Sequence, residues 1–297
     1  MNYTGLPYVI FVVGPTAVGK SAFAVDLALE KNGEIISADS MQVYRGFNLG
    51  TAKPDAAARK GVAHHMIDVA DPKEDYSAAA FSEAAQAKVA DVLARGRQPI
   101  VCGGSGLYVH ALLYEMDFAG RARDEALRGR LEREAVEHGG EYLFAKLLEA
   151  DPGAAAHVHP NNVKRVVRAL ERTAGSFENT GMRGFEGTFA APKRYDARVI
   201  RLTADRKALY ERIERRAEAF FAAGLVSEVK RLLENGVLRG GTAMQGIGYK
   251  EVAAMLAGET DEAEALRLVK QNTRRYAKRQ ETWFKRYADA EIIERNY

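Results

Sequence analysis

The sequence predicts an α/β fold in which a parallel sheet is flanked by helices and carries an inserted all-helical domain. Two observations predict the sheet: short apolar runs alternate with helical stretches over the first hundred residues, and small residues follow the apolar runs. A third predicts the insertion, because residues 114–194 carry charges at helix-surface spacing and no convincing strand. We therefore expect residues 1–113 and 195–297 to form one domain and residues 114–194 a second.

Each expected strand is a short apolar run. Residues 8–13 (YVIFVV) come first, and a glycine-containing turn leads from them into a helical stretch at residues 21–30 (SAFAVDLALE). Residues 34–37 (EIIS) and 99–104 (PIVCGG) follow, and residues 197–202 (ARVIRL) return the chain to the sheet before the final long helices. Because helices separate the strands, the sheet is expected to be parallel and to gather ligands at the carboxyl ends of its strands.

Length and composition indicate a globular protein of a reducing compartment. A chain of 297 residues suits about two domains of about 150 residues each, and 47% hydrophobic with 28% charged residues excludes wholesale disorder. The single cysteine, Cys102, excludes an intrachain disulfide and a cysteine-rich zinc site. The opening apolar run is too short to cross a bilayer. We expect a cytoplasmic monomer without a membrane partner.

Charge is informative through its distribution, because the net charge of +3 is small. Residues 270–286 hold seven basic side chains and one acidic side chain, a local balance of +6 that suits a polyanion. In the expected helical insertion most charges should lie on solvated faces. The run NNVKRVVRALER is an exception, because Arg165 and Arg168 would share one helix face, with Lys164 beside them.

The strongest motif occupies the turn between the first expected strand and helix. It matches the complete pattern G-x-x-x-x-G-K-[ST] in the strand–turn–helix setting that this pattern requires, and it makes the expected fold P-loop NTPase-like. Its glycines let backbone N–H groups converge on an anion, Lys20 adds a positive charge, and Ser21 offers a hydroxyl ligand to Mg²⁺. The eight residues are Gly14, Pro15, Thr16, Ala17, Val18, Gly19, Lys20 and Ser21.

The motif alone does not identify the phosphate compound. A nucleoside triphosphatase would carry a carboxylate at the end of a later hydrophobic strand, whereas the run at 99–104 is followed by Ser105. Ser105 suits a role in the site and a role in a tight turn equally well. The missing carboxylate favours a phosphorylated substrate other than ATP.

Asp39 follows the second expected strand and should lie at the same edge of the sheet as the P-loop. A carboxylate there suits Mg²⁺ ligation, or general-base chemistry toward a nucleophile in line with a phosphorylated leaving group. Helix capping is an equal alternative, because Asp-Ser before a turn is also capping chemistry. The adjacent His64 and His65 point to different sides of any regular element and have no further ligand cluster, so we interpret them as structural.

Taken together, these segments resemble one family, the tRNA dimethylallyltransferases, which transfer an isopentenyl group to the adenosine just 3′ of the anticodon. The matching segments are GPTAVGKS, ISADSMQVY, NLGTAKP, HHMIDV, YSAAAF, GGSGLY, HPNNVKRVVRALE, GTAMQGIGYKE and RRYAKRQETWF, in family order from residue 14 to residue 284. Ser21 stands where many members have Thr, a hydroxyl in either case. The chain lacks the C-terminal Cys/His zinc element of eukaryotic members, so it resembles the bacterial ones.

The resemblance implies roles at the P-loop. The loop would hold the diphosphate of dimethylallyl diphosphate rather than ATP, and Thr16 would hydrogen-bond near the bridging oxygen of the leaving group. Lys20 and Arg216 would stabilise its growing charge, and Ser21 would help to hold Mg²⁺, the implied cofactor. Asp39 would accept a proton from the exocyclic amine of the target adenine while that nitrogen attacks the allylic carbon. Asp39, Thr16 and Arg216 are thus the implied catalytic residues.

The resemblance also implies an interface with the anticodon stem-loop of tRNA, in which the target base leaves its stack and the helical insertion clamps the RNA. Aromatic residues in the basic C-terminal stretch, Tyr276, Trp283 and Phe284, either stack on bases or pack the helix onto the core, and we favour packing. The implied tRNA-binding residues are Asp39, Ser40, Met41, Gln42, Ser105, Arg128, Lys164, Arg165, Val166, Val167, Arg168, Gln245, Gly246, Ile247, Gly248, Tyr249 and Lys250.

Three other functions compete with this interpretation. An adenylate isopentenyltransferase would run the same chemistry on free AMP, ADP or ATP, but the helical insertion and the +6 segment argue against it. A P-loop small-molecule kinase would hold ATP in the loop and would transfer its γ-phosphate. A non-catalytic RNA-binding protein would bind anticodon stem-loops unchanged after replacement of Lys20.

Overall fold

The computed structural model describes residues 5–116, 125–174, 189 and 191–296. The chain divides into two compact units, which we refer to as the α/β unit (residues 1–115 and 192–297) and the helical unit (residues 116–191). The boundaries expected from the sequence differ from these by two residues at one junction and three at the other.

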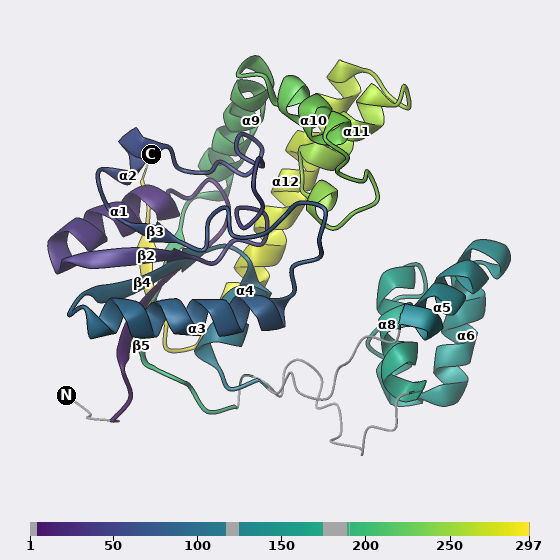
Figure 1. Ribbon diagram of the computed structural model, residues 1–297, viewed down its shortest axis with the longest axis horizontal. Coiled ribbons are helices and arrows are strands. Elements are labelled where there is room, and N and C mark those ends of the chain that lie inside the picture. The colour runs from purple at the N-terminus through teal and green to yellow at the C-terminus, as the bar shows by residue number, and fades with distance from the viewer. Residues whose placement is uncertain (1–4, 117–124, 175–188, 190, 297) are drawn as a thin grey trace. The chain divides into compact units, whose positions relative to one another are not determined.

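The α/β unit is built on a parallel sheet. Among the described residues the strand order is β3-β2-β4-β1-β5-β6, and every neighbouring pair is parallel (Figure 1). The strands are β1 (Tyr8–Val13), β2 (Gly33–Ser37), β3 (His64–His65), β4 (Gln98–Gly103), β5 (Asp196–Thr203) and β6 (Glu291–Glu294). The expected parallel sheet and its four predicted strands are confirmed. The prediction missed β3 and β6, because two and four residues are too short to give a distinctive apolar run.

Helices cover the sheet, with α1 and α3 on either side of the strands in Figure 1. Several begin after a side chain that caps the first turn: Ser77 accepts a hydrogen bond from the N–H of Ala80, and Asp261 from the N–H of Glu264. The helices of this unit are α1 (Lys20–Lys31), α2 (Ala56–Arg59), α3 (Ala78–Ala94), α4 (Gly106–Leu113), α9 (Arg206–Ala222), α10 (Leu225–Glu234), α11 (Tyr249–Leu256) and α12 (Glu262–Phe284), with a 3-10 turn at Ala243–Gln245.

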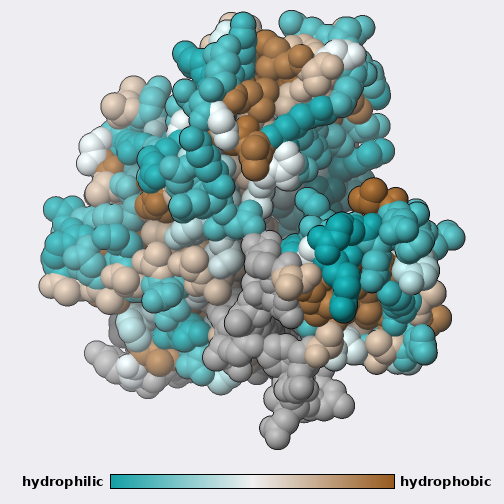
Figure 2. Space-filling view, turned by 45° about the vertical axis from the view of Figure 1, so that its right-hand side comes forward, coloured by the Kyte–Doolittle hydropathy of each residue, from teal (hydrophilic) through white to brown (hydrophobic). Residues whose placement is uncertain are grey.

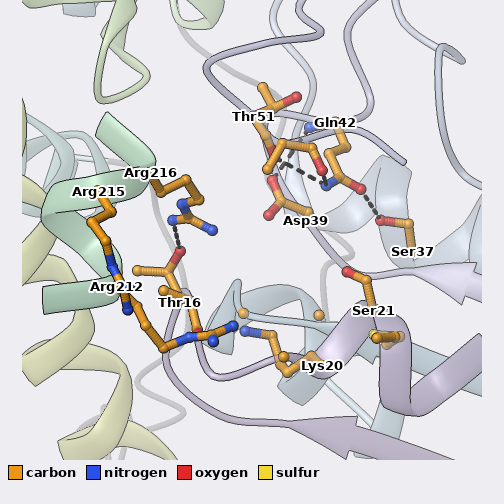
Figure 3. Close-up of a pocket in the computed structure, with 17 residues that line it drawn as sticks. Thr16, Lys20, Ser21, Ser37, Asp39, Gln42, Thr51, Arg212, Arg215 and Arg216 are labelled. Atoms are coloured by element: carbon orange, nitrogen blue, oxygen red, sulfur yellow. Dashed lines mark hydrogen bonds between the residues drawn. The ribbon is translucent and has the colours of Figure 1, made fainter. Parts of the chain in front are cut away.

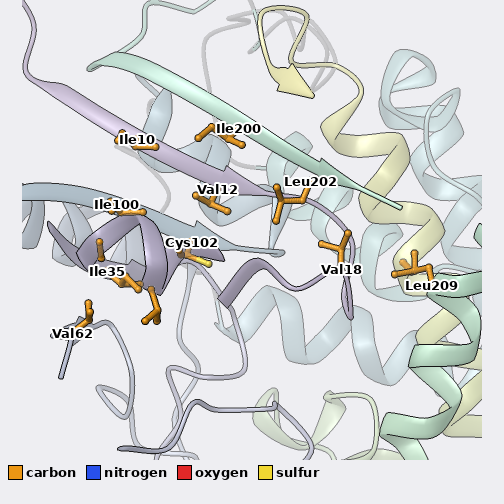
Figure 4. Close-up of a cluster of buried hydrophobic side chains, with 14 of the residues drawn as sticks. Ile10, Val12, Val18, Ile35, Val62, Ile100, Cys102, Ile200, Leu202 and Leu209 are labelled. Atoms are coloured by element: carbon orange, nitrogen blue, oxygen red, sulfur yellow. The ribbon is translucent and has the colours of Figure 1, made fainter. Parts of the chain in front are cut away.

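A cluster of buried aliphatic side chains fixes the middle of the sheet. Ile10 and Val12 of β1 pack with Ile100 of β4 and with Ile200 and Leu202 of β5 (Figure 4). Each of these side chains is almost completely buried, and such burial contributes about 1.5–3 kcal/mol per residue. The core therefore holds in place the ends of β1 and β4, from which the loops of the site emerge.

An ion-pair cluster surrounds the buried Glu34 of β2, with His65 from β3 and Arg95 from the end of α3. Both oxygens of Glu34 accept hydrogen bonds from the guanidinium of Arg95, and Nε2 of His65 lies 2.6 Å from the Oε2 of Glu34. The hydrogen bonds from Arg95, followed by the one from His65, lower the pKa of Glu34 to about 2. The Nδ1 of His64 lies 2.9 Å from the carbonyl oxygen of Val62. Both histidines therefore make local hydrogen bonds, and the described residues contain no cluster of three or more side chains that could hold a metal ion.

The helical unit consists of α5 (Glu125–His138), α6 (Gly140–Ala150), α7 (Pro152–Ala155) and α8 (Val163–Ala174) in its described part. Its core includes Leu143 and Leu147 of α6 and Val166 and Val167 of α8. Val166 is 0% and Val167 is 1% exposed. The expectation that these two side chains bind tRNA is therefore wrong, because valine side chains at these positions hold the helices of the unit together.

None of the described helices is both long enough and apolar enough to cross a membrane. On the face shown in Figure 2, hydrophilic residues form most of the surface and hydrophobic residues form smaller groups between them.

Candidate active site

The P-loop connects β1 to α1 through turns that require glycine. Gly14 has a φ of 144°, and a Cβ on it would lie 2.5 Å from the carbonyl oxygen of Leu202 on β5. Gly19, directly before α1, has a φ of 85°. Between them, Val18 is completely buried in the core cluster and anchors the loop. The loop thus ends at the N-terminus of a twelve-residue helix, where backbone N–H groups and the helix dipole favour an anion.

A cavity of about 490 Å³ opens beside the P-loop (Figure 3). Its walls come from the P-loop, the segment after β2, the end of β4 and helix α9, so segments that are far apart in the sequence form one site. The charged or polar side chains of the lining are Thr16, Lys20, Ser21, Ser37, Asp39, Gln42, Thr51, Cys102, Arg212, Arg215 and Arg216. Four lining residues are cationic and one is acidic, so the cavity is suited to an anion.

Two cations of the cavity, Lys20 and Arg216, are partly deprived of water, and this burial disfavours their charged forms. Lys20 donates to the carbonyl oxygen of Pro15 at 2.7 Å, and burial, with a smaller effect of Arg216, lowers its pKa from 10.5 to about 8. Burial also lowers the pKa of Arg216 to about 10, against the opposite effect of Asp39. An anion that enters the cavity would relieve the cost of burying these charges, which is the physical reason to regard the cavity as an anion-binding site.

Thr16 and Arg216 meet directly, although 200 residues separate them in the sequence. An Nη2–H of Arg216 on α9 donates to the Oγ1 of Thr16 (Figure 3). The neighbouring Arg212 donates from Nε to the carbonyl oxygen of Ala17 at 2.9 Å. Helix α9 therefore supplies the P-loop with two arginines. The sequence pattern did not distinguish Arg212 from a surface residue, because three arginines in RIERR look alike until the helix is docked.

Asp39 lies across the cavity from Arg216 (Figure 3). Its Oδ1 accepts hydrogen bonds from the N–H groups of Met41 at 2.9 Å and Gln42 at 3.2 Å. The turn-capping role and the site role, alternatives in the sequence, are thus compatible: one oxygen fixes the carboxylate, and the group still lines the cavity. Asp39 also raises the pKa values of Lys20 and Arg216, so it is electrostatically coupled to both.

The wall around Asp39 is a network of short side chains. Ser105, at the start of α4, accepts from the N–H of Ser40 at 2.8 Å and donates to its Oγ at 3.1 Å. Gln42 accepts from Ser37 at 3.0 Å and donates to the carbonyl oxygen of Thr51 at 3.1 Å. Ser40, Met41, Gln42 and Ser105 are therefore brought together beside Asp39.

The segment from Gln245 to Lys250 is mostly a structural support. Tyr249 is 0% exposed, and its hydroxyl donates to Glu228 at 2.6 Å. Glu228 also accepts from the N–H groups of Asn48 and Leu49, at 3.0 and 3.1 Å, and so anchors the loop that carries Thr51. The expectation that the Tyr249 side chain binds tRNA is wrong for this reason, and buried Gly246 and Gly248 offer no side chain either.

Within the same segment, Gln245 and Lys250 are exposed and Ile247 is partly buried. Glu228 is a functional support that the sequence analysis missed. Its signal was an acid on the apolar face of VSEVKRLLE, since Leu225, Val229 and Leu232 are the other buried residues of that helix.

Helix α12 packs against the glycine-rich end of β4. A Cβ on Gly106 would lie 2.5 Å from the Nε1 of Trp283 on α12. On the other side, a Cβ on Gly103 would lie 2.1 Å from the carbonyl oxygen of Ala38, which follows β2. Phe284 is completely buried, and the hydroxyl of Tyr276 donates to the carbonyl oxygen of Gly104 at 3.3 Å. These aromatic residues pack the helix onto the core, as we favoured.

The remaining predicted residues belong to the helical unit. Lys164, Arg165 and Arg168 are exposed on α8, opposite its buried valines. Arg128 on α5 is partly buried and pairs with Glu132 at 3.1 Å. The first three form a basic face that suits phosphate groups.

Comparisons with known proteins identify the family of this chain. The family model described as IPP transferase matches residues 42–287. A tRNA dimethylallyltransferase of Alkaliphilus oremlandii is 46% identical over 94% of this chain and 88% of its own length, and one of Bacillus subtilis is 43% identical over 96% and 90%. The crystal structure of the full-length tRNA isopentenylpyrophosphate transferase from Bacillus halodurans has a TM-score of 0.71 at 41% identity, covering 97% of this chain and 89% of its own.

A second solved structure, of a eukaryotic dimethylallyltransferase acting on tRNA, has a TM-score of 0.78 at 28% identity. The match covers 97% of this chain and 74% of that one.

Proposed function

The chain belongs to the IPP transferase family, and from that premise we propose that it transfers the dimethylallyl group of dimethylallyl diphosphate to N6 of the adenosine 3′ of the anticodon (position 37) in tRNA. The products are N6-isopentenyladenosine and diphosphate. One observation carries the proposal: the cavity opposes a carboxylate, Asp39, to a hydroxyl–guanidinium pair, Thr16 and Arg216, beside a P-loop lysine.

The reaction has a donor side and an acceptor side. On the donor side the C–O bond between the allylic carbon and the diphosphate breaks, and the electron pair stays with the diphosphate oxygen. Thr16 and Arg216 donate hydrogen bonds toward that oxygen, and Lys20 stabilises the added charge. On the acceptor side N6 of adenine forms the new C–N bond, and Asp39 accepts the N6 proton. Because the carboxylate is already fixed through Oδ1, it needs no reorganisation to do so.

Magnesium fits this site as a partner of the diphosphate. Ser21 lines the cavity with its hydroxyl. Mg²⁺ commonly takes one or two protein oxygens together with phosphate oxygens and water, and this donor set offers that arrangement. Ser21 would hold the ion, which neutralises part of the diphosphate charge when bound.

On the acceptor side, the tRNA is held by two kinds of residue. Ser40, Gln42 and Ser105 surround Asp39 and offer polar groups to the edge of an unstacked base. The phosphate backbone would be contacted by the exposed cations Lys164 and Arg165. Further contacts to it would come from Arg128, Arg168, Gln245 and Lys250. We propose a cytoplasmic monomer, in keeping with its tRNA substrate.

The test is incubation of the purified protein with Mg²⁺, dimethylallyl diphosphate and an unmodified anticodon stem-loop, followed by mass analysis of the RNA. The expected result is a gain of one C5H8 unit on the adenosine 3′ of the anticodon. Asp39→Asn should slow the transfer at least about 100-fold, the lower range for loss of a general base. Asp26→Asn, the same change at an exposed site on α1, is the matched control and should retain the wild-type rate.

Other outcomes discriminate the alternatives. Alkylation of free AMP but not of the stem-loop would replace the proposal with an adenylate isopentenyltransferase. Transfer of a γ-phosphate from ATP would identify a kinase. A protein that binds the stem-loop equally well after Lys20→Ala and transfers nothing would be a non-catalytic RNA-binding protein.

A further inference from the structure

Gln280 on α12 joins two loops of the site through one side-chain amide. Its Oε1 accepts the N–H of Thr16 at 2.7 Å, and its Nε2 donates to the carbonyl oxygen of Gly104 at 2.8 Å. The side chain is 4% exposed, and the hydrogen bond to Gly104 is fully buried. The residue thus connects the P-loop, the end of β4 and a helix that begins more than 240 residues after the P-loop.

The contact with Thr16 determines what that residue can offer to a ligand. Its backbone N–H is already used by Gln280, whereas its hydroxyl bonds to Arg216 and lines the cavity. Thr16 is therefore held from two sides by two different helices. With its N–H engaged, Thr16 can contribute to catalysis through the hydroxyl alone, in the orientation that the backbone sets.

We propose that Gln280 is a positioning residue: its amide fixes the backbone of Thr16 so that the Thr16 hydroxyl and Arg216 together face the leaving diphosphate oxygen. This inference rests on the proposed function. Gln280 itself does not line the cavity and acts through Thr16.

The chemistry of the position suits an amide. One end of the group must accept from an N–H and the other must donate to a carbonyl oxygen, and the amide of glutamine offers both in one rigid plane. Glutamate could accept from Thr16 but would face the Gly104 carbonyl with a second acceptor. Methionine has a similar length and offers neither hydrogen bond.

Gly104 shows how closely the amide is seated. A Cβ on Gly104 would lie 2.2 Å from the Nε2 of Gln280 and 3.6 Å from the Nζ of Lys20. Both groups therefore approach the same point, so that a carboxylate at position 280 would lie near Lys20. The close approach also explains the second glycine of GGSG, because any side chain there would push the amide away.

The experiment measures kcat and KM for dimethylallyl diphosphate in the stem-loop assay with Gln280→Met and Gln280→Glu. Gln280→Met removes both hydrogen bonds without adding charge, so kcat should fall at least tenfold while KM changes less than threefold. Gln280→Glu keeps an acceptor for Thr16 but adds a negative charge near the diphosphate, so KM should rise at least fivefold. Gln86→Met on α3, where the amide donates to Ser82 at 3.0 Å, is the matched control and should keep both constants.

A double-mutant cycle tests whether Gln280 affects kcat through Thr16. If Gln280 acts through Thr16, then Gln280→Met should lower kcat less than twofold in a Thr16→Ala background. Equal fold-losses in both backgrounds would overturn the positioning role, as would a kcat of Gln280→Met within twofold of the Gln86→Met value. If Gln280→Met does not fold, the inference is tested by the KM of Gln280→Glu for dimethylallyl diphosphate. An unchanged KM would then overturn the inference. An inactive wild-type protein would instead contradict the proposed function.

Discussion

The lowered pKa of Lys20 predicts how diphosphate binding depends on pH. With a pKa of about 8, the lysine is about nine-tenths protonated at pH 7 and about one-tenth protonated at pH 9 in the free protein. A bound diphosphate favours the charged form, so the proton must be taken up when the free lysine is neutral. The affinity for dimethylallyl diphosphate should therefore fall about tenfold between pH 7 and pH 9, about 1.4 kcal/mol.

The same pKa makes the stability of the unliganded protein depend on pH in the opposite direction. The folded state releases the Lys20 proton near pH 8 and the unfolded state near 10.5, so between these values the unfolded state binds more protons. The free energy of unfolding of the unliganded protein should thus rise with pH across that window, while ligand affinity falls. Arg216, with a pKa of about 10, stays largely charged up to pH 9 and does not account for the loss.

The assay is equilibrium binding of dimethylallyl diphosphate at constant ionic strength, from pH 7 to pH 9, with the wild-type protein and Lys20→Met. The variant serves as the baseline, since any titration of the ligand itself appears equally in both proteins. Lys20→Met should bind more weakly at pH 7 and should lack the tenfold loss. Parallel pH profiles for the two proteins would refute the assignment of the titration to Lys20.

Three further predictions concern stability and RNA affinity. Glu34→Gln should lower the free energy of unfolding at pH 7 by about 1.5 kcal/mol in urea titrations, the low end for hydrogen bonds to a charged group because the Arg95 side chain is 41% exposed. This deficit should shrink as pH falls from 4.5 toward about 2, where wild-type Glu34 is itself protonated. Tyr249→Phe leaves Glu228 one donor short and should cost about 1.5–3 kcal/mol in the same titrations, whereas an unchanged midpoint would refute the support role. In stem-loop binding assays, Arg165→Ala should reduce the slope of log affinity against log salt concentration by about 1. The neighbouring change Val166→Ala removes a buried side chain and should instead lower the thermal stability of the protein.

Residues whose role depends on local spacing were predictable from the sequence. The P-loop could be read between Gly14 and Ser21 because each of its features is local: a strand, two glycines at fixed spacing and a helix start. Asp39 was placed at the same edge of the sheet because parallel strands share that edge. The strands of the sheet centre were predicted for the same reason, since burial on both faces gives continuous apolar runs.

Residues whose role depends on the packing of distant segments were not predictable from the sequence. Tyr249 looked like part of an RNA-binding motif, and only the position of Glu228 shows that it is buried support for the loop at Asn48. Gln280 belongs to the matching segment RRYAKRQETWF, but only the approach of α12 to Gly104 shows that its amide contacts the P-loop.

The sequence by itself determined the sheet, the phosphate-binding loop and the family resemblance, because these follow from patterns within a few turns of chain. Tertiary structure alone decided that Arg212 of α9 also reaches the P-loop, which residues of the matching motifs reach the cavity, and which of them hold the cavity together. The physical reason is that burial and hydrogen-bond partners across 200 residues depend on how helices pack, and no local pattern records that packing.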